Sequence, residues 1–479
     1  MPHHPTHGMT RREFNTAIGA GAVGTALRQV PGAPAPPVAA VGAGRTSELC
    51  ELTAVELADR LRRKQVSARD VMAAHLAQME RVNPRVNAIV TLVADQAMAN
   101  ATRADEAIAR RGPLGVLHGL PVAHKDLVDT AGIRTTRGSL FYKDNIPARD
   151  ALIVTRMRAA GAITVGKTNT PEFGAGSQTF NAVFGATRNP YDLTRTCGGS
   201  SGGAAAAVAA RMLPIADGTD TAGSLRNPPA FCNVVGLRPS PGRVASESTA
   251  WSPLSVAGPI ARTVADVALF LSAIAGPDPR SPLAIAEDPA RFRAPLRRDF
   301  KGVRVAWWRG LGGLPFEAEI RRVVDGTRKV FEDLGCVVEE AEPDFAGLDQ
   351  AFPALRFAAN YSQYAPLVQQ RPEWVKDTIK FEVPVTQVAP FDVNTPYPTD
   401  VAGTPMATYL DWMRSCWYVT MMANPALSVP AGFTAGGLPV GLQIVGRHRD
   451  EWSVLQLGHA FEQATRHGAR RPAMLETTA

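Results

Sequence analysis

The sequence predicts one large α/β domain in which helices cover a mostly buried β-sheet. Short apolar segments with strand character alternate with helical segments from about residue 120 to the end. The chain has 479 residues, 45% of them hydrophobic and 20% charged, which is enough to bury a large single core. Neither a repeat of fixed period nor a low-complexity linker follows residue 45, so one domain is favoured over two.

Residues 1–45 differ from the remainder and are interpreted as a leader. The sequence Thr10-Arg11-Arg12-Glu13-Phe14 resembles a twin-arginine export motif, and a mildly apolar run and a Pro/Ala/Gly stretch follow it. The alternatives are a disordered cytoplasmic leader or a start at Met9. The protein is thus expected either in the cytoplasm or exported to the periplasm or medium, with its folded domain over residues 46–479.

Three helices are expected at the start of the folded domain. Capping-box spacings at Thr53–Glu56 and Ser67–Asp70 predict where the first two begin. The expected apolar faces are Val55, Leu57 and Leu61 in the first helix and Val71, Leu76 and Met79 in the second. A third helix is expected over residues 93–109, and Gly112-Pro113 ends this helical region.

The pattern then changes to strands, helices and turns. Residues 120–124 are expected to form a strand leading into Lys125, and residues 163–165 a second strand followed by a loop at 166–169. Further expected strands are 303–307, 337–339, 426–430 and 440–445, and further expected helices are 152–160, 317–334 and 451–466.

Composition and spacing argue against several other classes of protein. The formal charge of +7 is spread along the chain, and the densest basic cluster, residues 60–64, has no aromatic residues interleaved, so nucleic-acid binding is not indicated. Five widely spaced cysteines form neither a disulfide framework nor a metal-ligand pattern. No run of about 18 apolar residues predicts a membrane span. We therefore expect neither metal nor cofactor.

The stretch Gly198–Arg226 looks like a functional site. It holds an alanine-rich helical segment between two turns of small residues, and glycine is used where backbone must approach a ligand closely. Its first turn, Gly198-Gly199-Ser200-Ser201-Gly202, also fits the nucleophile elbow of α/β-hydrolases. That elbow needs a strand immediately before it, whereas residues 188–192 read as a turn, which argues against this interpretation.

Four stretches together resemble the amidase signature family of serine hydrolases over about residues 46–475. They are His118 to Asp126, Gly166 to Asn169 with Glu172-Phe173, Gly198 to Arg226, and Leu438 to Gln443. The resemblance implies a central twisted mixed β-sheet with α-helices on both faces. By position it implies Ser224 as the nucleophile, Ser200 as the bridging serine after a cis peptide bond, and Lys125 as the base.

The expected chemistry is a proton relay. A serine hydroxyl needs a base to take its proton, and a lysine serves only when its pKa of about 10.4 is lowered toward neutrality. Burial without a carboxylate partner lowers it. The expected oxyanion donors are the backbone N–H groups of Thr221, Ala222, Gly223 and Ser224. The family commonly has glycine at the position of Ala222. The extra methyl group of Ala222 is expected to tighten the pocket or restrict the turn.

Several neighbouring residues are expected to support the site rather than react. Asp220 and Arg226 flank the nucleophile turn and are expected to pair, and Ser201 is assigned to the same supporting set. His124 is adjacent to Lys125, but successive strand residues point to opposite faces, so a structural role is favoured for it.

The predicted function is hydrolysis of a carboxylic acid amide to a carboxylate and ammonia or an amine, through an acyl-Ser224 intermediate. Alternatives are the glutamine-hydrolysing subunit of a tRNA-dependent amidotransferase, a carbamate or ester hydrolase, or a pseudoenzyme. The amidotransferase subunit usually has a Ser-Leu-Asp run that residues 252–259 lack. The expected partner is a small-molecule amide; a homodimer is left open. Relatives typically carry several dozen more residues at Lys380-Phe381, so either a helix is absent there or the sequence contains a gene-model error. Loss of that helix is expected to widen the cleft or weaken the fold.

Overall fold

Two β-sheets carry the fold of the computed structural model, which describes residues 48–110, 112, 114–247, 254–376 and 388–475. The first has the order β1-β3-β2 and the second the order β16-β15-β9-β10-β8. Their strands are β1 (Ile89–Leu92), β2 (Pro121–Lys125), β3 (Ile163–Thr168), β8 (Ile215–Asp220), β9 (Val235–Arg238), β10 (Val256–Ala261), β15 (Ala426–Phe433) and β16 (Pro439–Val445). Strands β2 and β3 run parallel, whereas the other pairs in these sheets are antiparallel. The three-stranded sheet is therefore mixed, as expected, whereas the five-stranded sheet is antiparallel throughout.

The two sheets meet where β2 lies beside β8. Here a buried side chain connects them. The carboxylate of Asp217 on β8 accepts the backbone N–H of Lys125 at 2.7 Å and contacts the ring Nδ1 of His124 at 2.6 Å. The end of β2 is thereby held against the end of β8, which positions Lys125.

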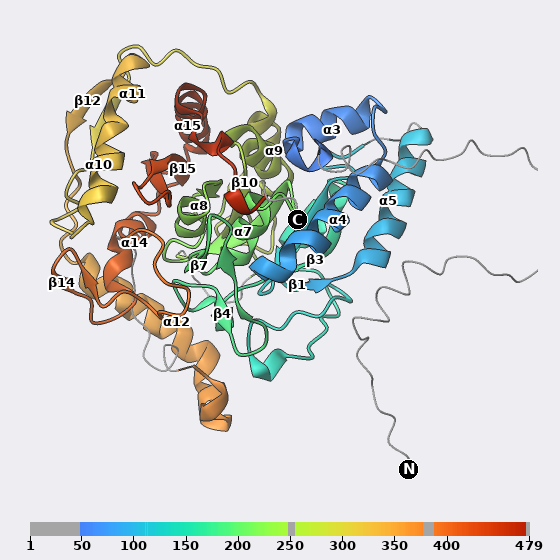
Figure 1. The fold of residues 1–479 in the computed structure, drawn as a ribbon, viewed down its shortest axis with the longest axis horizontal. Helices are drawn as coiled ribbons and strands as arrows, with labels where there is room; N and C mark the ends of the chain where they lie inside the picture. The colour runs from blue at the N-terminus through green and yellow to red at the C-terminus, as the bar shows by residue number, and fades with distance from the viewer. Residues whose placement is uncertain (1–47, 111, 113, 248–253, 377–387, 476–479) are drawn as a thin grey trace, which may run out of the picture. The chain divides into compact units, whose positions relative to one another are not determined.

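Helices cover both faces of the five-stranded sheet (Figure 1). Helices α9 (Val264–Ile274) and α15 (Glu451–Thr465) contact each other and one face, and α7 (Gly202–Ala209) and α8 (Asn227–Phe231) contact each other and the opposite face. All eight residues of α7 are buried, because its alanines and glycines let it pack closely against its neighbours. The predicted helix-covered α/β fold is confirmed.

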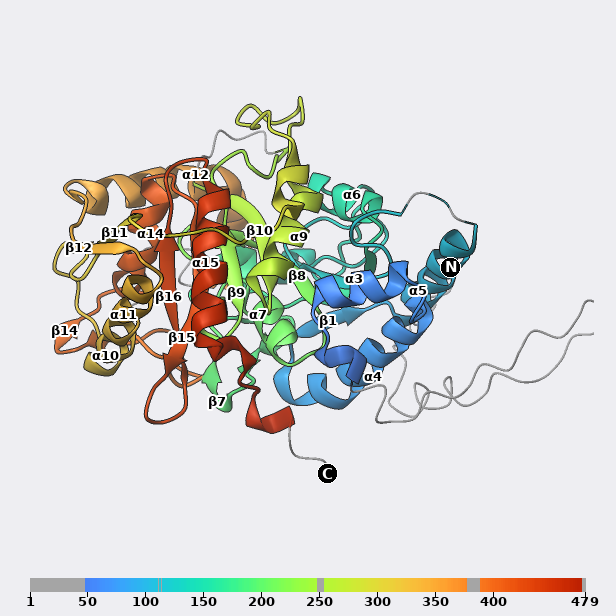
Figure 2. The ribbon, with the colours of Figure 1, turned by 90° about the horizontal axis from the view of Figure 1, so that it is seen from above.

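The remaining elements lie toward the two ends of this assembly (Figures 1 and 2). One end has α3 (Ala54–Arg62), α4 (Ala68–Val86) and α5 (Ala94–Ala109). The other has the parallel pair β11 (Arg304–Trp307) and β12 (Val337–Glu340) with α10 (Ala318–Gly326), α11 (Arg328–Asp333), α12 (Leu348–Gln370) and α14 (Arg414–Met421). Short elements are α6 (Leu152–Ala159) and the strand pairs β4 (Phe180–Asn181) with β5 (Gly185–Ala186) and β13 (Asp400–Val401) with β14 (Thr404–Pro405).

Both predicted capping boxes are present, at Thr53 and Ser67. The expected apolar faces need one correction. Val55 is 40% exposed, because the buried side of α3 is formed by Ala54, Leu57, Ala58 and Leu61 instead. Leu76 is partly buried and packs against the core, as expected, and Met72 and His75 add to the buried face of α4.

Three other expectations are wrong in detail. Strand β3 continues through the expected loop to Thr168, because Gly166 marks a close approach of β1: a Cβ there would lie 1.9 Å from the Thr91 carbonyl oxygen. The expected helix 317–334 is two helices, separated at Thr327, whose hydroxyl donates to the Val324 carbonyl. Residues 188–192 are not a simple turn.

Residues 188–192 belong to a hairpin of β6 (Arg188–Asn189) and β7 (Asp192–Thr196), so a short strand does precede Ser200. The described residues all fall within one compact unit, Gly42–Ala479, and none of their helices is long and apolar enough to cross a membrane. No disulfide joins the five cysteines, all of which are described and buried. The predicted leader at 1–45 and the Lys380-Phe381 junction lie outside the described residues.

Candidate active site

The amine of Lys125 lies at the centre of a buried group of hydroxyls. Its Nζ donates to Ser200 Oγ at 2.6 Å, to Ser201 Oγ at 2.9 Å and to Thr219 Oγ1 at 2.9 Å. The side chain is fully buried at the end of β2. Among the described residues, no carboxylate lies within ion-pairing distance of this amine.

Burial lowers the pKa of Lys125 from 10.5 to about 7, although the more distant charges of Asp220 and Asp217 oppose the shift. Removing an ammonium group from water disfavours its charged form, and three neutral hydroxyls do not restore it as a carboxylate would. At neutral pH a large share of Lys125 is consequently the free amine, which is the form that can accept a proton.

The two predicted serines continue the chain of hydrogen bonds. Ser200 follows β7 and is preceded by a cis peptide bond from Gly199, as the resemblance implied. Its Oγ is 3.0 Å from the Oγ of Ser224, which lies in the turn after β8. Lys125, Ser200 and Ser224 are thus brought into one continuous line, through which a proton can pass from Ser224 to the amine.

The turn that presents Ser224 is held by the buried carboxylate of Asp220. This group accepts the backbone N–H groups of Gly223 and Leu225, each at 2.9 Å. It also pairs with Arg226 at 2.9 Å and with Arg238 at 3.1 Å. Burial alone would raise the pKa of Asp220, but the two guanidinium groups outweigh it and hold that pKa well below its usual range.

Arg226 anchors the same turn to the C-terminal part of the chain. Besides its predicted ion pair with Asp220, its guanidinium donates to the Cys416 carbonyl at 2.6 Å, the Thr420 hydroxyl at 2.9 Å and the Gln443 side-chain oxygen at 2.7 Å. A supporting role for Asp220 and Arg226 follows from these contacts.

One expected oxyanion donor is engaged elsewhere. The N–H of Gly223 donates to Asp220, so only the N–H groups of Thr221, Ala222 and Ser224 have no acceptor among the described residues. The extra methyl of Ala222 is buried in an apolar cluster that includes Phe231 and Leu254. The turn accommodates alanine at this position because that methyl packs into the core.

His124 is placed as predicted, away from the serines. It is fully buried, with its Nε2 3.0 Å from the Thr164 hydroxyl and its Nδ1 on Asp217. Two residues of this region were not predicted, Asp217 and Thr219. They are two positions apart on β8 and so lie on the same side of the strand. Strand periodicity would have grouped them with the site if β2 had been known to lie beside β8.

A second buried lysine, Lys167 on β3, was also missed. Its amine donates to the Val128 carbonyl and to the Thr130 hydroxyl, the latter at 2.8 Å, and burial lowers its pKa to about 8. It braces the segment that follows Lys125. Within the described ranges, no three His, Cys, Asp or Glu side chains are grouped so as to hold a metal ion.

Comparison with known proteins identifies the family. A family model described as Amidase matches residues 70–375 and 376–455. A glutamyl-tRNA(Gln) amidotransferase subunit of Moorella thermoacetica is 37% identical and is matched over 89% of this chain and 99% of its own length. An acylamidase of Rhodococcus erythropolis is 35% identical over 88% of this chain and 97% of its own.

Among solved structures, a bacterial aryl acylamidase of the amidase signature enzymes superposes with a TM-score of 0.81 and 26% identity, covering 89% of this chain and 99% of that one. The relatives thus include both an acylamidase and one component of an amidotransferase. The chain belongs to the amidase signature family and is a hydrolase of amide C–N bonds.

Proposed function

We propose that this protein is a free-standing amidase that releases an amine or ammonia from a small carboxylic amide through an acyl-Ser224 intermediate. The observation that carries the proposal is the unbroken line from the Lys125 amine to Ser200 Oγ at 2.6 Å and on to Ser224 Oγ at 3.0 Å. Its base is a buried lysine whose pKa lies near 7.

In the first step Ser200 Oγ takes the proton of Ser224 while giving its own to the neutral amine of Lys125. Ser224 Oγ bonds to the amide carbon, and the carbonyl electron pair moves onto oxygen. The N–H groups of Thr221, Ala222 and Ser224 are the candidate donors to that oxyanion.

Collapse of the intermediate breaks the C–N bond, and the proton held on Lys125 returns through Ser200 to the departing nitrogen. Water then attacks the acyl-Ser224 ester with the same relay acting as base, which releases the carboxylate and restores Ser224. Every group in the cycle is regenerated.

An aromatic wall near Ser200 favours an apolar or aromatic acyl group. Phe173 stacks on Tyr364 with ring centroids 4.6 Å apart, and Tyr142 meets Phe173 edge-on at 6.1 Å. The next residue, Gly174, lies so near the relay that a Cβ there would be 3.6 Å from Ser200 Oγ. Aromatic faces gain most from burying flat apolar groups.

The test is a substrate panel of aryl and alkyl amides, an ester and a carbamate, each assayed with Ser224→Ala as the blank and with EDTA added. We expect amide hydrolysis that Ser224→Ala abolishes and EDTA leaves unchanged, with aryl amides preferred. Hydrolysis that persists in Ser224→Ala, or that EDTA abolishes, would contradict the mechanism. Cleavage of only the ester or carbamate would contradict the assignment of an amide substrate.

A second candidate is the glutamine-hydrolysing component of an amidotransferase, favoured by the 37% identity with the Moorella thermoacetica protein. It predicts slow glutaminase activity that rises several-fold when the other purified components of a bacterial tRNA-dependent amidotransferase are added. Glutamine hydrolysis that such partners leave unchanged, together with turnover of simple amides, would favour the free-standing amidase.

A further inference from the structure

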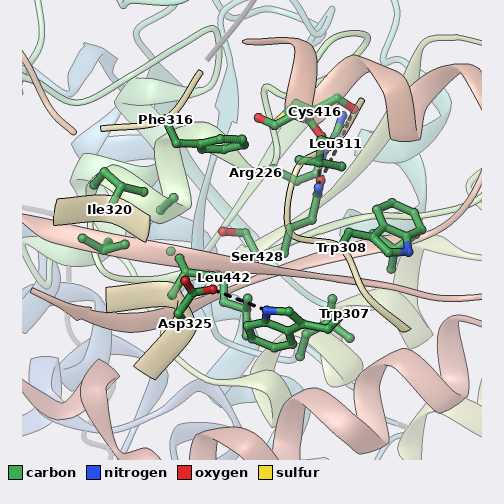
Figure 3. Close-up of a pocket in the computed structure, with 18 of the residues that line it drawn as sticks. Arg226, Trp307, Trp308, Leu311, Phe316, Ile320, Asp325, Cys416, Ser428 and Leu442 are labelled. Carbon is green, nitrogen blue, oxygen red and sulfur yellow. Dashed lines mark hydrogen bonds between the residues drawn. The ribbon is translucent and has the colours of Figure 1, made fainter. Parts of the chain in front are cut away.

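A cavity of about 400 Å³ lies between α8, the β15–β16 hairpin, β11 and α10 (Figure 3). Its size falls within the range of about 300–1,000 Å³ that is usual for small-molecule sites. None of Lys125, Ser200 and Ser224 lines it. Its walls are largely apolar and include Trp307, Trp308, Leu311, Phe316, Ile320 and Leu442.

Two polar groups interrupt these apolar walls. Ser428 on β15 is 2% exposed, its hydroxyl points into the cavity (Figure 3), and it has no hydrogen-bond partner among the described residues. Asp325 on α10 accepts the indole N–H of Trp307 on one carboxylate oxygen at 3.4 Å. Its other oxygen has no partner in the described part of the chain. A hydroxyl that faces a cavity without a protein partner is available to hydrogen-bond a bound group.

Among the described residues, four arginines and one carboxylate line the cavity, and the arginines are already engaged: Arg321 lies over the Phe316 ring and donates to the Arg309 carbonyl. Arg226 also lines it, but the guanidinium is committed to Asp220, Cys416, Thr420 and Gln443. At the rim, Arg304 is paired with Glu339 and Arg309 lies 3.8 Å from Glu340. The carboxylate of Asp325 repels a negative group and accepts a hydrogen bond from a donor.

We propose that this cavity binds a neutral two-ring aromatic molecule that carries one O–H or N–H donor. An apolar cavity of about 150 Å³ already admits benzene, so the larger volume here suits two fused rings. The rings would lie among Phe316, Ile320 and Leu442, and the donor would face Ser428 and Asp325. Binding here requires no turnover, so it stands apart from the proposed function.

The test is calorimetric titration of the full-length protein with 1-naphthol, and with 1-methoxynaphthalene as the matched ligand that cannot donate. The variants are Ser428→Ala, Asp325→Asn and the cavity-filling Ile320→Trp. Asp325→Asn keeps an oxygen for Trp307 while removing the charge. Ser272→Ala, on α9 and outside the cavity, is the matched serine control. Circular dichroism establishes that each variant is folded, and amide turnover does so as well for every variant except Ser224→Ala.

We expect one saturable site for 1-naphthol whose affinity is at least tenfold weaker for 1-methoxynaphthalene and for Ser428→Ala or Asp325→Asn. Ile320→Trp should abolish binding, while Ser272→Ala and Ser224→Ala should leave it unchanged. Absence of a saturable site, equal affinity for the two ligands, or full affinity in both polar variants would overturn the proposal. Loss of 1-naphthol binding in Ser224→Ala would also overturn it, because the ligand would then occupy the catalytic site.

Discussion

The pH dependence of turnover is the sharpest consequence of the buried lysine. Burial lowers the pKa of Lys125 to about 7, so at pH 7 about half of the amine is neutral and able to accept a proton. With its ordinary pKa of 10.5, only roughly one molecule in 3,000 would be neutral at that pH. The ratio of kcat to KM should therefore rise about tenfold from pH 5 to pH 6 and level off above pH 8.

The same shift affects stability with a definite sign. Between about pH 7 and pH 10.5 the unfolded chain holds a proton on this lysine that the native state does not. The contribution of this group to the free energy of unfolding should consequently increase as the pH rises through that range.

The assay is hydrolysis of a chromogenic anilide such as 4-nitroacetanilide from pH 5 to pH 9, for the wild type and for Lys125→Met. Lys125→Met should lower kcat by about 10²–10⁴-fold and remove the inflection near pH 7. Lys167→Met is the matched control, because Lys167 is the other lysine that is buried among the described residues and its pKa is lowered to about 8. A profile that is flat down to pH 5, or an inflection lost in Lys167→Met but kept in Lys125→Met, would refute the reasoning.

Three further predictions follow from the site. Ser224→Ala should reduce amide turnover to the blank rate while the circular dichroism and thermal midpoint stay near those of the wild type, because only an Oγ is removed. Asp220→Asn should cost about 3–5 kcal/mol in urea unfolding, since it leaves two buried guanidinium groups without their counter-ion. Gly174→Ala should lower both stability and turnover, because φ is +71° there and a Cβ would lie 2.6 Å from Leu127 Cδ1.

Each of these has a plain contrary result. Measurable turnover in Ser224→Ala would move the nucleophile elsewhere. An Asp220→Asn protein as stable as the wild type would mean that the carboxylate does not hold the turn. Wild-type kinetics in Gly174→Ala would show that the backbone near Ser200 yields easily, and Gly132→Ala, at a positive-φ glycine with open space around it, is the matched control for conformational strain alone.

Features that depend on neighbouring residues alone could be predicted from the sequence. The helix starts at Thr53 and Ser67 depend only on residues three positions away, so their capping boxes are visible without the fold. The predictions are wrong where a segment distant in the sequence decides the local structure. Gly166 reads as a loop residue, yet it lies in a strand because β1 approaches it too closely for any side chain.

The candidate site divides in the same way. Ser200, Ser224 and Lys125 were assigned by position from the resemblance of their local motifs to those of the amidase signature family. The sequence did not predict three other contacts: the hydrogen bond from Gly223 to Asp220 and the contacts that Thr219 and Asp217 make with Lys125. Each depends on where another strand or turn lies.

By itself, the sequence determined the fold class, and its motifs assigned the three groups of the proposed relay and the pair of Asp220 and Arg226. Only the tertiary structure decided that the Lys125 amine is fully buried among three hydroxyls, and that Arg226 joins the nucleophile turn to α14 and β16. The physical reason is that a pKa and a buried ion pair depend on desolvation and on charges brought together from remote parts of the chain. Neither the pKa of Lys125 nor the ion pair of Arg226 can therefore be derived from a local stretch of residues.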